Sequence, residues 1–584
     1  MADLYTKYGN YDLSPRMRVE GFDNEASEGY GAMLSEIESC KEQGKRVFTF
    51  DLYPGVDKAS LLTQLETLNP ALLIESEDCA LTKEELSQFY ESDLTTDQVF
   101  GIKTHKNLID CFVPHKLAAA QEEVKNTSGI VFIIGVGAGL ISHGDIYFYF
   151  NISRWEIQLR YRAGMPNWHC DNMNDPILSK YKRGFFIEWR IADKHKKAHF
   201  EDMNYMVDAN IPNCPKMITG KAYRAALYQM SRRPIRLKPY FDPGVWGGQW
   251  MRSAFGLPQN APNYAWSFDG VPEENGLQFQ FGEVMAEFPC MDMVLYRPHQ
   301  LLGERVHGRF GAEFPIRFDL LDTIGGGNLS LQVHPLTEYI QENFGMNYTQ
   351  DESYYILDTA EGNDAYVYLG LKEGIDRSAM IADLRLAEKG GAQFPVEKYV
   401  NRVPVKKHDH VLIPAGTVHC SGKNTMVLEI SATPYIFTFK LYDWGRVGLD
   451  GKPRPIHIDH GEKNIQWDRD TKWVYSNIVG QAKVCHKEEG EIVERTGLHA
   501  REFIETYRST FNKSIIRKCD DSVHVLNLVD GGQITVSSPK GAFAPFEVHY
   551  AETFIIPASA NEYCLSPSGI SSGMTVKVID AFVR

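Results

Sequence analysis

The sequence predicts a multidomain chain in which an N-terminal α/β domain with a parallel sheet precedes all-β barrels carrying helical inserts. Three observations lead to this fold class. The chain has 584 residues, which is too many for one hydrophobic core. Strand and helix signals alternate up to about residue 235, as in parallel sheets. From about residue 239 the chain is rich in glycine, aromatic and β-branched residues, which is typical of short antiparallel strands.

In the first region, each apolar strand signal is followed by a helix or turn signal. The expected strands are 46–51, 129–135 and 145–150, and the expected helices are 61–68 and 156–162. A strand that returns to the same sheet through a helix favours parallel pairing.

The second region has the short strand signals separated by turn signals that are typical of an antiparallel β-barrel. Its expected strands are 329–335, 354–357, 365–369, 410–413 and 426–430, with helical inserts at 338–344 and 377–388.

The third region, from about residue 465, has the same pattern of short strand signals. Its expected strands are 523–528, 533–537, 553–557 and 574–579. Segment 555–562 echoes segment 412–419, with Glu562 in the place of His419. We therefore expect an N-terminal extension (1–45), an α/β domain (46–235), a metal-binding barrel (236–464) and a second barrel without that metal site (465–584).

The composition argues against several classes of function. A formal net charge of −15 disfavours binding to nucleic-acid phosphates, although a local basic pocket can still hold a small phosphorylated molecule. The N-terminus lacks the apolar stretch of a signal peptide, and the apolar run at 130–134 is too short to span a bilayer. The ten cysteines are scattered, so we expect free thiols and a cytoplasmic protein with no membrane partner.

Four residues of the second region form a candidate metal site. Gln332 and His334 lie two apart on a strand, so their side chains share one face. Glu352 precedes the next strand, and His419 ends a Pro-x-Gly-x-x-His turn. An amide oxygen, two imidazoles and one carboxylate suit Zn²⁺ and leave it a net positive charge. Either histidine alone could be an ordinary barrel residue; the combination favours a metal.

Several motifs of this region resemble the signature stretches of class I mannose-6-phosphate isomerases, which are zinc-dependent cupins. The resemblance covers about residues 239–584 in collinear order, and its motifs are 239–248, 329–335, 368–370, 413–419, 441–446 and 451–454. It implies double-stranded β-helix (cupin) barrels and the interconversion of mannose 6-phosphate and fructose 6-phosphate. It places the zinc ligands of the family on Gln332, His334, Glu352 and His419, and a phosphate contact on Ser330.

The sequence also departs from the pattern of that family. Gln350 stands two residues before the ligand glutamate, where many members carry lysine, and Asp319 replaces another usual lysine. Lys440 occupies the position of an arginine thought to be catalytic, and 431–437 lacks the usual Gln and Asp residues. These changes remove cations that would bind a phosphate.

Aldose–ketose isomerisation moves a proton between C1 and C2 through an enediol, so it needs an acid–base group and a cation near the oxygens. Lys440 or Arg446 could stabilise the developing enediolate, and Lys440 with a lowered pKa could act as the base. Glu429 is a further base candidate; alternatively it pairs with a cation of the barrel. Arg446 could equally form a surface ion pair with Asp443.

Lys452 and Arg454 are candidates for contacting the substrate phosphate. Both follow Gly451 in a turn, and a solvated turn is the alternative interpretation.

The N-terminal region resembles a degenerate uridine-kinase-like P-loop domain. Segment 53–60 lies between a strand and a helix, as a P-loop does, but Asp57 and Ala59 replace the glycine and the hydroxyl residue of a working loop. The segment 145–162, with Arg160 and Arg162, adds to the resemblance. We expect a kinase-like fold that has lost catalysis.

The sequence thus predicts a zinc-dependent aldose–ketose isomerase acting on a small sugar phosphate. The alternatives are an isomerase of another sugar and a non-catalytic sugar-binding cupin in which zinc orders the ligand. A further alternative is a sugar or nucleoside kinase, which Asp57 and Ala59 disfavour. The oligomeric state stays open.

Overall fold

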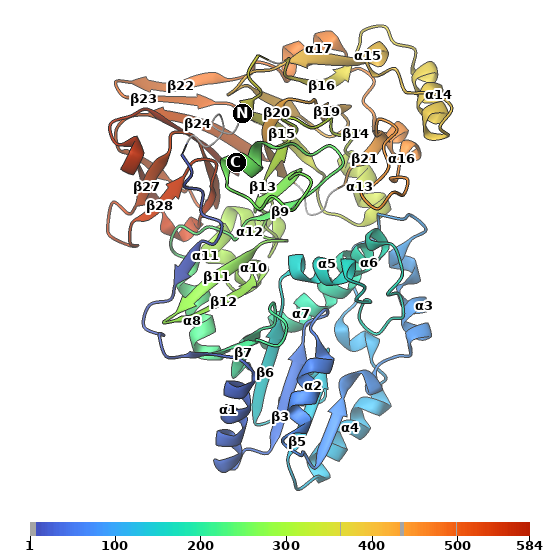
Figure 1. Cartoon of the computed structure of the whole chain (residues 1–584), viewed down its shortest axis with the longest axis vertical. Coiled ribbons are helices and arrows are strands. Elements are labelled where there is room, and N and C mark those ends of the chain that lie inside the picture. Colours follow the sequence, from blue (N-terminus) through green and yellow to red (C-terminus); the bar gives the residue numbers. More distant parts are fainter. Residues whose placement is uncertain (1–7, 363, 433–436, 498) are drawn as a thin grey trace. The chain divides into compact units, whose positions relative to one another are not determined.

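The computed structural model describes residues 8–584 apart from 363, 433–436 and 498 (Figure 1). The chain forms two compact units. The N-terminal unit comprises residues 16–230 and 273–297, and the C-terminal unit comprises 1–15, 231–272 and 298–584.

The N-terminal unit is built on a seven-stranded sheet in the order β2-β8-β7-β6-β3-β5-β4. Strands β4, β5, β3, β6 and β7 run parallel to one another, and β8 and β2 extend the sheet antiparallel. The strands are β2 (Ala26–Glu28), β3 (Val47–Leu52), β4 (Leu72–Glu75), β5 (Val131–Gly135), β6 (Ile146–Asn151), β7 (Tyr205–Asp208) and β8 (Lys216–Thr219). The central strands β3, β5 and β6 are buried along their whole length, as expected for a parallel sheet covered on both faces.

Helices connect these strands. They are α1 (Tyr30–Glu42), α2 (Lys58–Glu66), α3 (Lys83–Leu94), α4 (Pro114–Asn126), α5 (Arg154–Arg162), α6 (Ile177–Arg183), α7 (Trp189–His199), α8 (Gly220–Met230) and α10 (Met291–Tyr296). The unit is completed by a second, three-stranded sheet of β1 (Arg16–Arg18), β11 (Gly276–Phe281) and β12 (Val284–Pro289). Segment 273–297 thus belongs to this unit although it lies far along the chain.

A buried network of charges lies beyond the carboxyl ends of β3 and β6. Arg154 pairs with Glu273 and, at 2.6 Å, with Asp193. Lys196 pairs with Asp292 at 2.5 Å. All five side chains are less than a tenth exposed. In open α/β sheets this edge is where ligands bind, at the point where the strand order reverses; here the protein's own ion pairs occupy it.

The C-terminal unit contains two pairs of antiparallel sheets. The first pair has a six-stranded sheet, β18-β15-β20-β13-β10-β9, and a five-stranded sheet, β17-β16-β19-β14-β21. The strands are β9 (Tyr240–Asp242), β10 (Trp266–Gly270), β13 (Arg317–Asp322), β14 (Leu331–Val333), β15 (Asp351–Thr359), β16 (Tyr366–Leu371), β17 (Val400–Pro404), β18 (His410–Ile413), β19 (His419–Ser421), β20 (Thr425–Ala432) and β21 (Phe439–Tyr442).

The second pair has a six-stranded sheet, β22-β23-β24-β31-β26-β29, and a four-stranded sheet, β25-β30-β27-β28. The strands are β22 (Lys483–Glu488), β23 (Glu491–Arg495), β24 (Ile504–Phe511), β25 (Ile515–Lys518), β26 (His524–Asp530), β27 (Gln533–Ser537), β28 (Phe546–His549), β29 (Thr553–Ile556), β30 (Glu562–Pro567) and β31 (Val576–Val583). Phe511, Leu526 and Val578 of one sheet share a core with Ile515 and Leu565 of the other, so we call this part the C-terminal β-sandwich.

The C-terminal unit also contains short helices. They are α9 (Trp250–Ala254), α11 (Pro298–Leu302), α12 (Glu304–Phe310), α13 (Thr337–Phe344), α14 (Arg377–Glu388), α15 (Val396–Tyr399), α16 (Ile458–Asn464) and α17 (Thr471–Asn477). Helices α13 and α14 coincide with the two predicted inserts.

These elements confirm a multidomain chain that combines an α/β unit with many-stranded β units. The strand predicted at 329–335 is shorter, because only Leu331–Val333 pairs with neighbouring strands. Residues 16–45, predicted as an extension, supply β1, β2 and α1 to the N-terminal unit.

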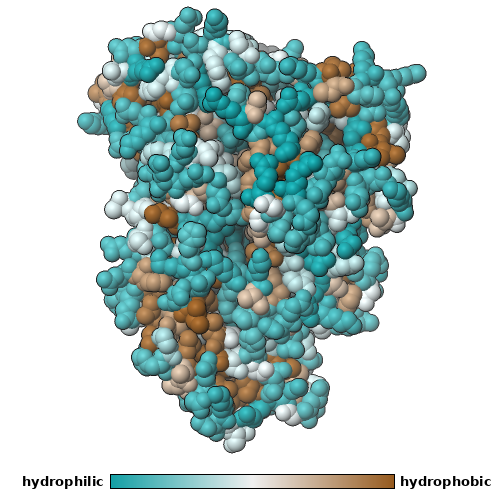
Figure 2. All heavy atoms as spheres, turned by 180° about the vertical axis from the view of Figure 1, so that it is seen from behind, coloured by the Kyte–Doolittle hydropathy of each residue, from teal (hydrophilic) through white to brown (hydrophobic). Residues whose placement is uncertain are grey.

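The surface, the cysteines and the helices give three further observations. Figure 2 shows hydrophilic residues over most of the face that it presents, with apolar residues in smaller patches. All ten cysteines are free thiols. None of the helices in the described part of the chain combines the length and apolar character needed to cross a bilayer.

Candidate metal centre

The candidate ligands come from both sheets of the first pair. Gln332 on β14 lies opposite His419 on β19 in the strand register. Glu352 lies on β15 of the facing sheet, and His334 follows β14 directly. Because side chains two apart share a face, Gln332 and His334 both point between the sheets.

The ligand atoms converge. The Nε2 atom of His334 lies 3.0 Å from Glu352 Oε2, and the Nε2 atom of His419 lies 2.8 Å from Glu352 Oε1. The side-chain amide of Gln332 lies 3.3 Å from His419 Nε2. His334, Glu352 and His419 are fully buried, and Gln332 is 6% exposed.

Second contacts fix the histidine rings. His334 Nδ1 lies 2.8 Å from the carbonyl oxygen of Phe437, and His419 Nδ1 lies 2.8 Å from that of Thr417. A carbonyl oxygen can only accept, so each Nδ1 carries the proton and each Nε2 is free to donate its lone pair to a metal.

The electrostatics of the cluster suit a cation. Burial raises the pKa of Glu352, but when His334 and His419 are protonated their charge outweighs burial and holds that pKa well below its usual range; a cation bound between neutral imidazoles would act in the same direction. Glu352 Oε1 and His334 Nε2 are buried without a well-formed hydrogen bond among the described residues. Two orphaned acceptors in a fully buried nitrogen and oxygen cluster fit a divalent metal such as Zn²⁺.

Arg469 and Asp351 brace the turn that carries His419. Arg469 Nη1 donates to the carbonyl oxygens of Pro414 and Ala415, at 2.7 Å each. Asp351 Oδ1 accepts from the backbone N–H of Ala415 at 2.7 Å. The sequence analysis did not find these residues, because Arg469 lies about 50 positions after the turn and no local pattern marks it.

Gln350, first noted as a departure from the family pattern, contacts the site directly. Its Nε2 donates to Glu352 Oε2 at 3.0 Å, and its Oε1 accepts from the backbone N–H of Phe437 at 3.0 Å. Gln350 therefore orients the carboxylate ligand and ties it to the segment that also holds His334.

Glu429 faces the same interior. It lies opposite Tyr354 on β15 and Asp319 on β13 in the strand register. Burial and the Glu352 and Asp319 carboxylates raise the pKa of Glu429 well above its usual range, although Arg317 opposes them. A carboxyl group with a raised pKa is suited to exchange a proton with a substrate.

Lys440 adjoins the cluster from β21, where it lies opposite Gln332. Burial, with the nearby Arg454 and Arg446 guanidinium groups, lowers the pKa of Lys440 to about 8. Arg446 Nη2 pairs with Asp443 at 2.5 Å, and Arg454 pairs with the other oxygen of the same carboxylate. The predicted ion pair of Arg446 thus forms, within a cluster of three cations and one acid.

The remaining predicted residues lie in different surroundings. Ser330 is 2% exposed and precedes β14, on the same alternating face as Gln332 and His334. Lys452 is exposed in the turn after β21, as its alternative interpretation held, and among the described residues it makes no side-chain ion pair.

Two kinds of similarity relate this chain to known proteins. The family model described as "Domain of unknown function (DUF8485)" matches residues 29–232, which lie within the N-terminal unit. This match assigns no activity to the N-terminal unit.

The other similarity is to sugar-phosphate isomerases. The "Putative mannose-6-phosphate isomerase YvyI" of Bacillus subtilis is 23% identical over 347 residues, which are 58% of this chain and 96% of that protein. The "Mannose-6-phosphate isomerase ManA" of the same organism is 28% identical over 235 residues, 39% of this chain and 67% of that protein. The chain is thus homologous to mannose-6-phosphate isomerases over part of its length, and this supports a sugar isomerase.

Among solved structures, the mannose 6-phosphate isomerase from Bacillus subtilis aligns with a TM-score of 0.47 at 20% sequence identity. The alignment covers 60% of this chain and 99% of that one.

Proposed function

We propose that the chain is a zinc-dependent aldose–ketose isomerase that interconverts mannose 6-phosphate and fructose 6-phosphate through an enediol. The observation that carries this proposal is the buried convergence of His334, Glu352 and His419. Beside them lie Glu429, whose pKa is raised, and Lys440, whose pKa is lowered. Homology to mannose-6-phosphate isomerases supports the substrate class.

Gln332, His334, Glu352 and His419 would hold the metal. Zn²⁺, when bound there, would polarise the carbonyl and hydroxyl oxygens of the sugar. The protein's own part is to present two Nε2 lone pairs and one carboxylate, with Gln350 keeping the carboxylate in place.

Lys440 and Glu429 are the groups we assign to proton transfer. Isomerisation needs one group that removes the proton from C2 and returns it to C1. Lys440 stands beside Gln332 in the sheet, and Glu429 shares the inner face with Glu352. Arg446 would stabilise negative charge that develops on the sugar oxygens.

The phosphate would be bound by Ser330 and by the cations that follow β21. Arg454 is half-buried within the cluster around Asp443, whereas Lys452 lies on the outside of the turn. Arg446 and Arg454 pair with Asp443, whereas the side chain of Lys452 makes no ion pair with any described residue.

A second candidate is an isomerase for an unphosphorylated sugar, or a cupin that binds sugar without turnover. It is favoured by the acidic interior, where Glu352, Glu429 and Asp319 lie close together, and by Asp443, whose carboxylate pairs with both Arg446 and Arg454. A phosphate entering here would compete with these carboxylates for the cations.

A coupled assay separates these functions. Zinc-loaded and chelator-treated protein is given mannose 6-phosphate or mannose, and ketose formation is followed. Metal-dependent turnover of the phosphorylated sugar supports the first proposal, and turnover of mannose alone supports the second. A zinc-loaded protein that turns over neither sugar would exclude isomerase function with these substrates.

For the N-terminal unit we propose a P-loop-like fold that no longer binds a nucleoside triphosphate. Segment 53–60 joins β3 to α2, as the resemblance requires. Asp57 caps α2 by accepting from the backbone N–H of Ser60 at 3.2 Å, and so a carboxylate holds the position that a phosphate would need. Lys58 pairs with Glu75 at 2.8 Å and with Glu77 at 2.9 Å, which neutralises its charge.

We further propose that both pairs of sheets in the C-terminal unit are cupin barrels, with boundaries near residues 236 and 465, and that the protein is cytoplasmic. The equivalent of His419 in the second barrel is Glu562, which pairs with Lys540 at 2.7 Å.

A further inference from the structure

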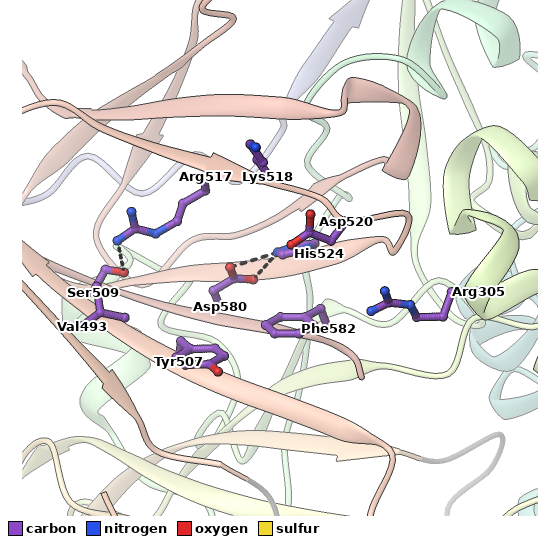
Figure 3. Close-up of a pocket in the computed structure, with 10 residues that line it drawn as sticks. All are labelled: Arg305, Val493, Tyr507, Ser509, Arg517, Lys518, Asp520, His524, Asp580 and Phe582. Carbon is purple, nitrogen blue, oxygen red and sulfur yellow. Dashed lines mark hydrogen bonds and ion pairs between the residues drawn. The ribbon is translucent and has the colours of Figure 1, made fainter. Parts of the chain in front are cut away.

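The C-terminal β-sandwich contains a cavity of about 580 Å³ that none of the candidate metal ligands lines (Figure 3). Its walls come from strands β23, β24, β25, β26 and β31, with Arg305 contributed by α12. Cavities of this volume are the usual size for small-molecule ligands.

The cavity is the open end of the sandwich interior. On β31, Val578 belongs to the apolar core, and Asp580 and Phe582 continue the same alternating face. On β24, Phe511 is in the core, and Tyr507 continues its face. The interior of the sandwich is therefore an apolar core at one end and is lined by polar and aromatic side chains at the other.

An ordered polar group lies at the centre of the cavity. His524 Nδ1 lies 2.8 and 2.9 Å from the two carboxylate oxygens of Asp580, and Tyr563 donates to Asp580 at 3.1 Å. Arg517 Nη2 donates to Ser509 at 2.9 Å and pairs with Glu491 at 2.6 Å. Polar side chains held in this way are preorganised to bind hydroxyl groups.

An aromatic shelf borders the polar group. The Tyr507 and Phe582 rings are almost parallel, with a 2° angle between planes and 5.7 Å between centroids. The His524 ring stacks on Phe582 at 4.8 Å. Tyr507 and Phe582 are partly exposed and line the cavity, so a ligand in it can reach the Tyr507 ring and the part of the Phe582 ring that His524 does not cover.

Besides Arg517, which is held by Ser509 and Glu491, Arg305 lines the cavity. Figure 3 shows Arg305 extending toward Phe582, whereas Lys518 points away from the His524–Asp580 pair. Among the described residues, Arg305 makes no ion pair. The loop beside it is fixed, because Asp521 accepts from the backbone N–H of Glu304 at 3.0 Å, and Asp520 and Asp521 adopt positive φ angles of 47° and 59°.

We propose that this cavity is a second sugar site, in which a monosaccharide ring packs its apolar face on the Tyr507–Phe582 shelf and its hydroxyl groups bond to Asp580 and Arg517. Arg305 would meet a phosphate if the sugar carries one. The alternation of apolar and hydroxyl-bearing surface on a pyranose matches an aromatic shelf beside fixed polar groups. The proposal does not depend on turnover at the metal centre.

Hydrogen exchange of the full-length protein locates the ligand. Glucose and glucose 6-phosphate are the probes, and we expect slower exchange in peptides from β24 and β31. Tyr507→Ala should weaken binding about tenfold, the size expected when one stacking ring is lost. Tyr507→Phe, which keeps the ring, should bind like the wild type, as should Tyr475→Ala, which removes an exposed tyrosine of α17.

The Arg305→Ala variant distinguishes a sugar phosphate from a free sugar as the ligand. Arg501→Ala, which removes another exposed arginine, is the matched control. If glucose 6-phosphate binds more tightly and Arg305→Ala removes that advantage, the ligand is a sugar phosphate; if both probes bind equally, it is a free sugar. Protection confined to β14, β15 and β19, or no protection at millimolar concentrations, overturns the proposal. Protection by AMP but by neither sugar also overturns it. Isomerase turnover, measured separately, is expected to be unchanged by Arg305→Ala.

Discussion

The Arg154–Glu273 ion pair should make the stability of the N-terminal unit sensitive to acid. Burial raises the pKa of Glu273, but Arg154 and Arg190 outweigh it and lower that pKa from 4.5 to about 2. At 1.36 kcal/mol for each pH unit, this difference corresponds to about 3 kcal/mol of unfolding free energy at neutral pH. Because the folded pKa is depressed, this contribution is complete above pH 4.5 and is lost as the pH falls toward 2; by pH 3, about 2 kcal/mol is gone.

Glu273→Gln isolates this contribution. The amide keeps the shape but removes the charge, leaving Arg154 paired with Asp193. We expect amide protection in α5 and α7, corrected for the intrinsic exchange rate, to fall about 300-fold relative to the wild type at pH 7 and only about tenfold at pH 3. Glu274→Gln is a neighbouring control, although its amide keeps only one oxygen in place of the two that accept from Gln158 and Tyr181.

Native hydrogen exchange is the appropriate assay, because a chain with two compact units has no single unfolding transition. Equal protection of wild type and Glu273→Gln at pH 7 would refute the assigned energy. A difference that does not shrink at pH 3 would show that it comes from packing rather than from charge.

Four further outcomes test the two units. His419→Ala should lose bound zinc, measured by elemental analysis, whereas Lys452→Ala should keep it; full zinc occupancy of His419→Ala would show that the metal site is assigned wrongly. Lys440→Met and Glu429→Gln should each lower kcat at least about 100-fold with zinc retained, and turnover within a few-fold of wild type would remove that residue from proton transfer. Arg469→Ala leaves the Pro414 and Ala415 carbonyls without their donor, which should cost about 1–3 kcal/mol and weaken zinc affinity; an unchanged Tm and zinc affinity would contradict the bracing role. ATP resin should not retain the protein in the presence of Mg²⁺, because Asp57 and the neutralised Lys58 disfavour binding of the ATP phosphates. Clear Mg²⁺-dependent retention would support the kinase hypothesis instead.

Local patterns in the sequence determined much of the fold. Continuous apolar runs identified β3, β5 and β6, because strands buried on both faces carry no polar alternation. The spacing of Gln332 and His334, together with the turn before His419, was enough to predict that these three residues lie close together. These features depend on residues close together in the chain, where strand period and turn geometry act directly.

The tertiary structure decided what depends on distant residues. Segment 273–297 returns to the N-terminal unit, where Glu273 neutralises Arg154 across more than 100 positions. The raised pKa of Glu429 and the lowered pKa of Lys440 arise from burial and from charged groups that the fold brings near them. Likewise, the cavity of the C-terminal β-sandwich exists because Tyr507, His524 and Asp580 meet across three strands. Burial and charge–charge distance are properties of the folded chain, and no local pattern in the sequence encodes them.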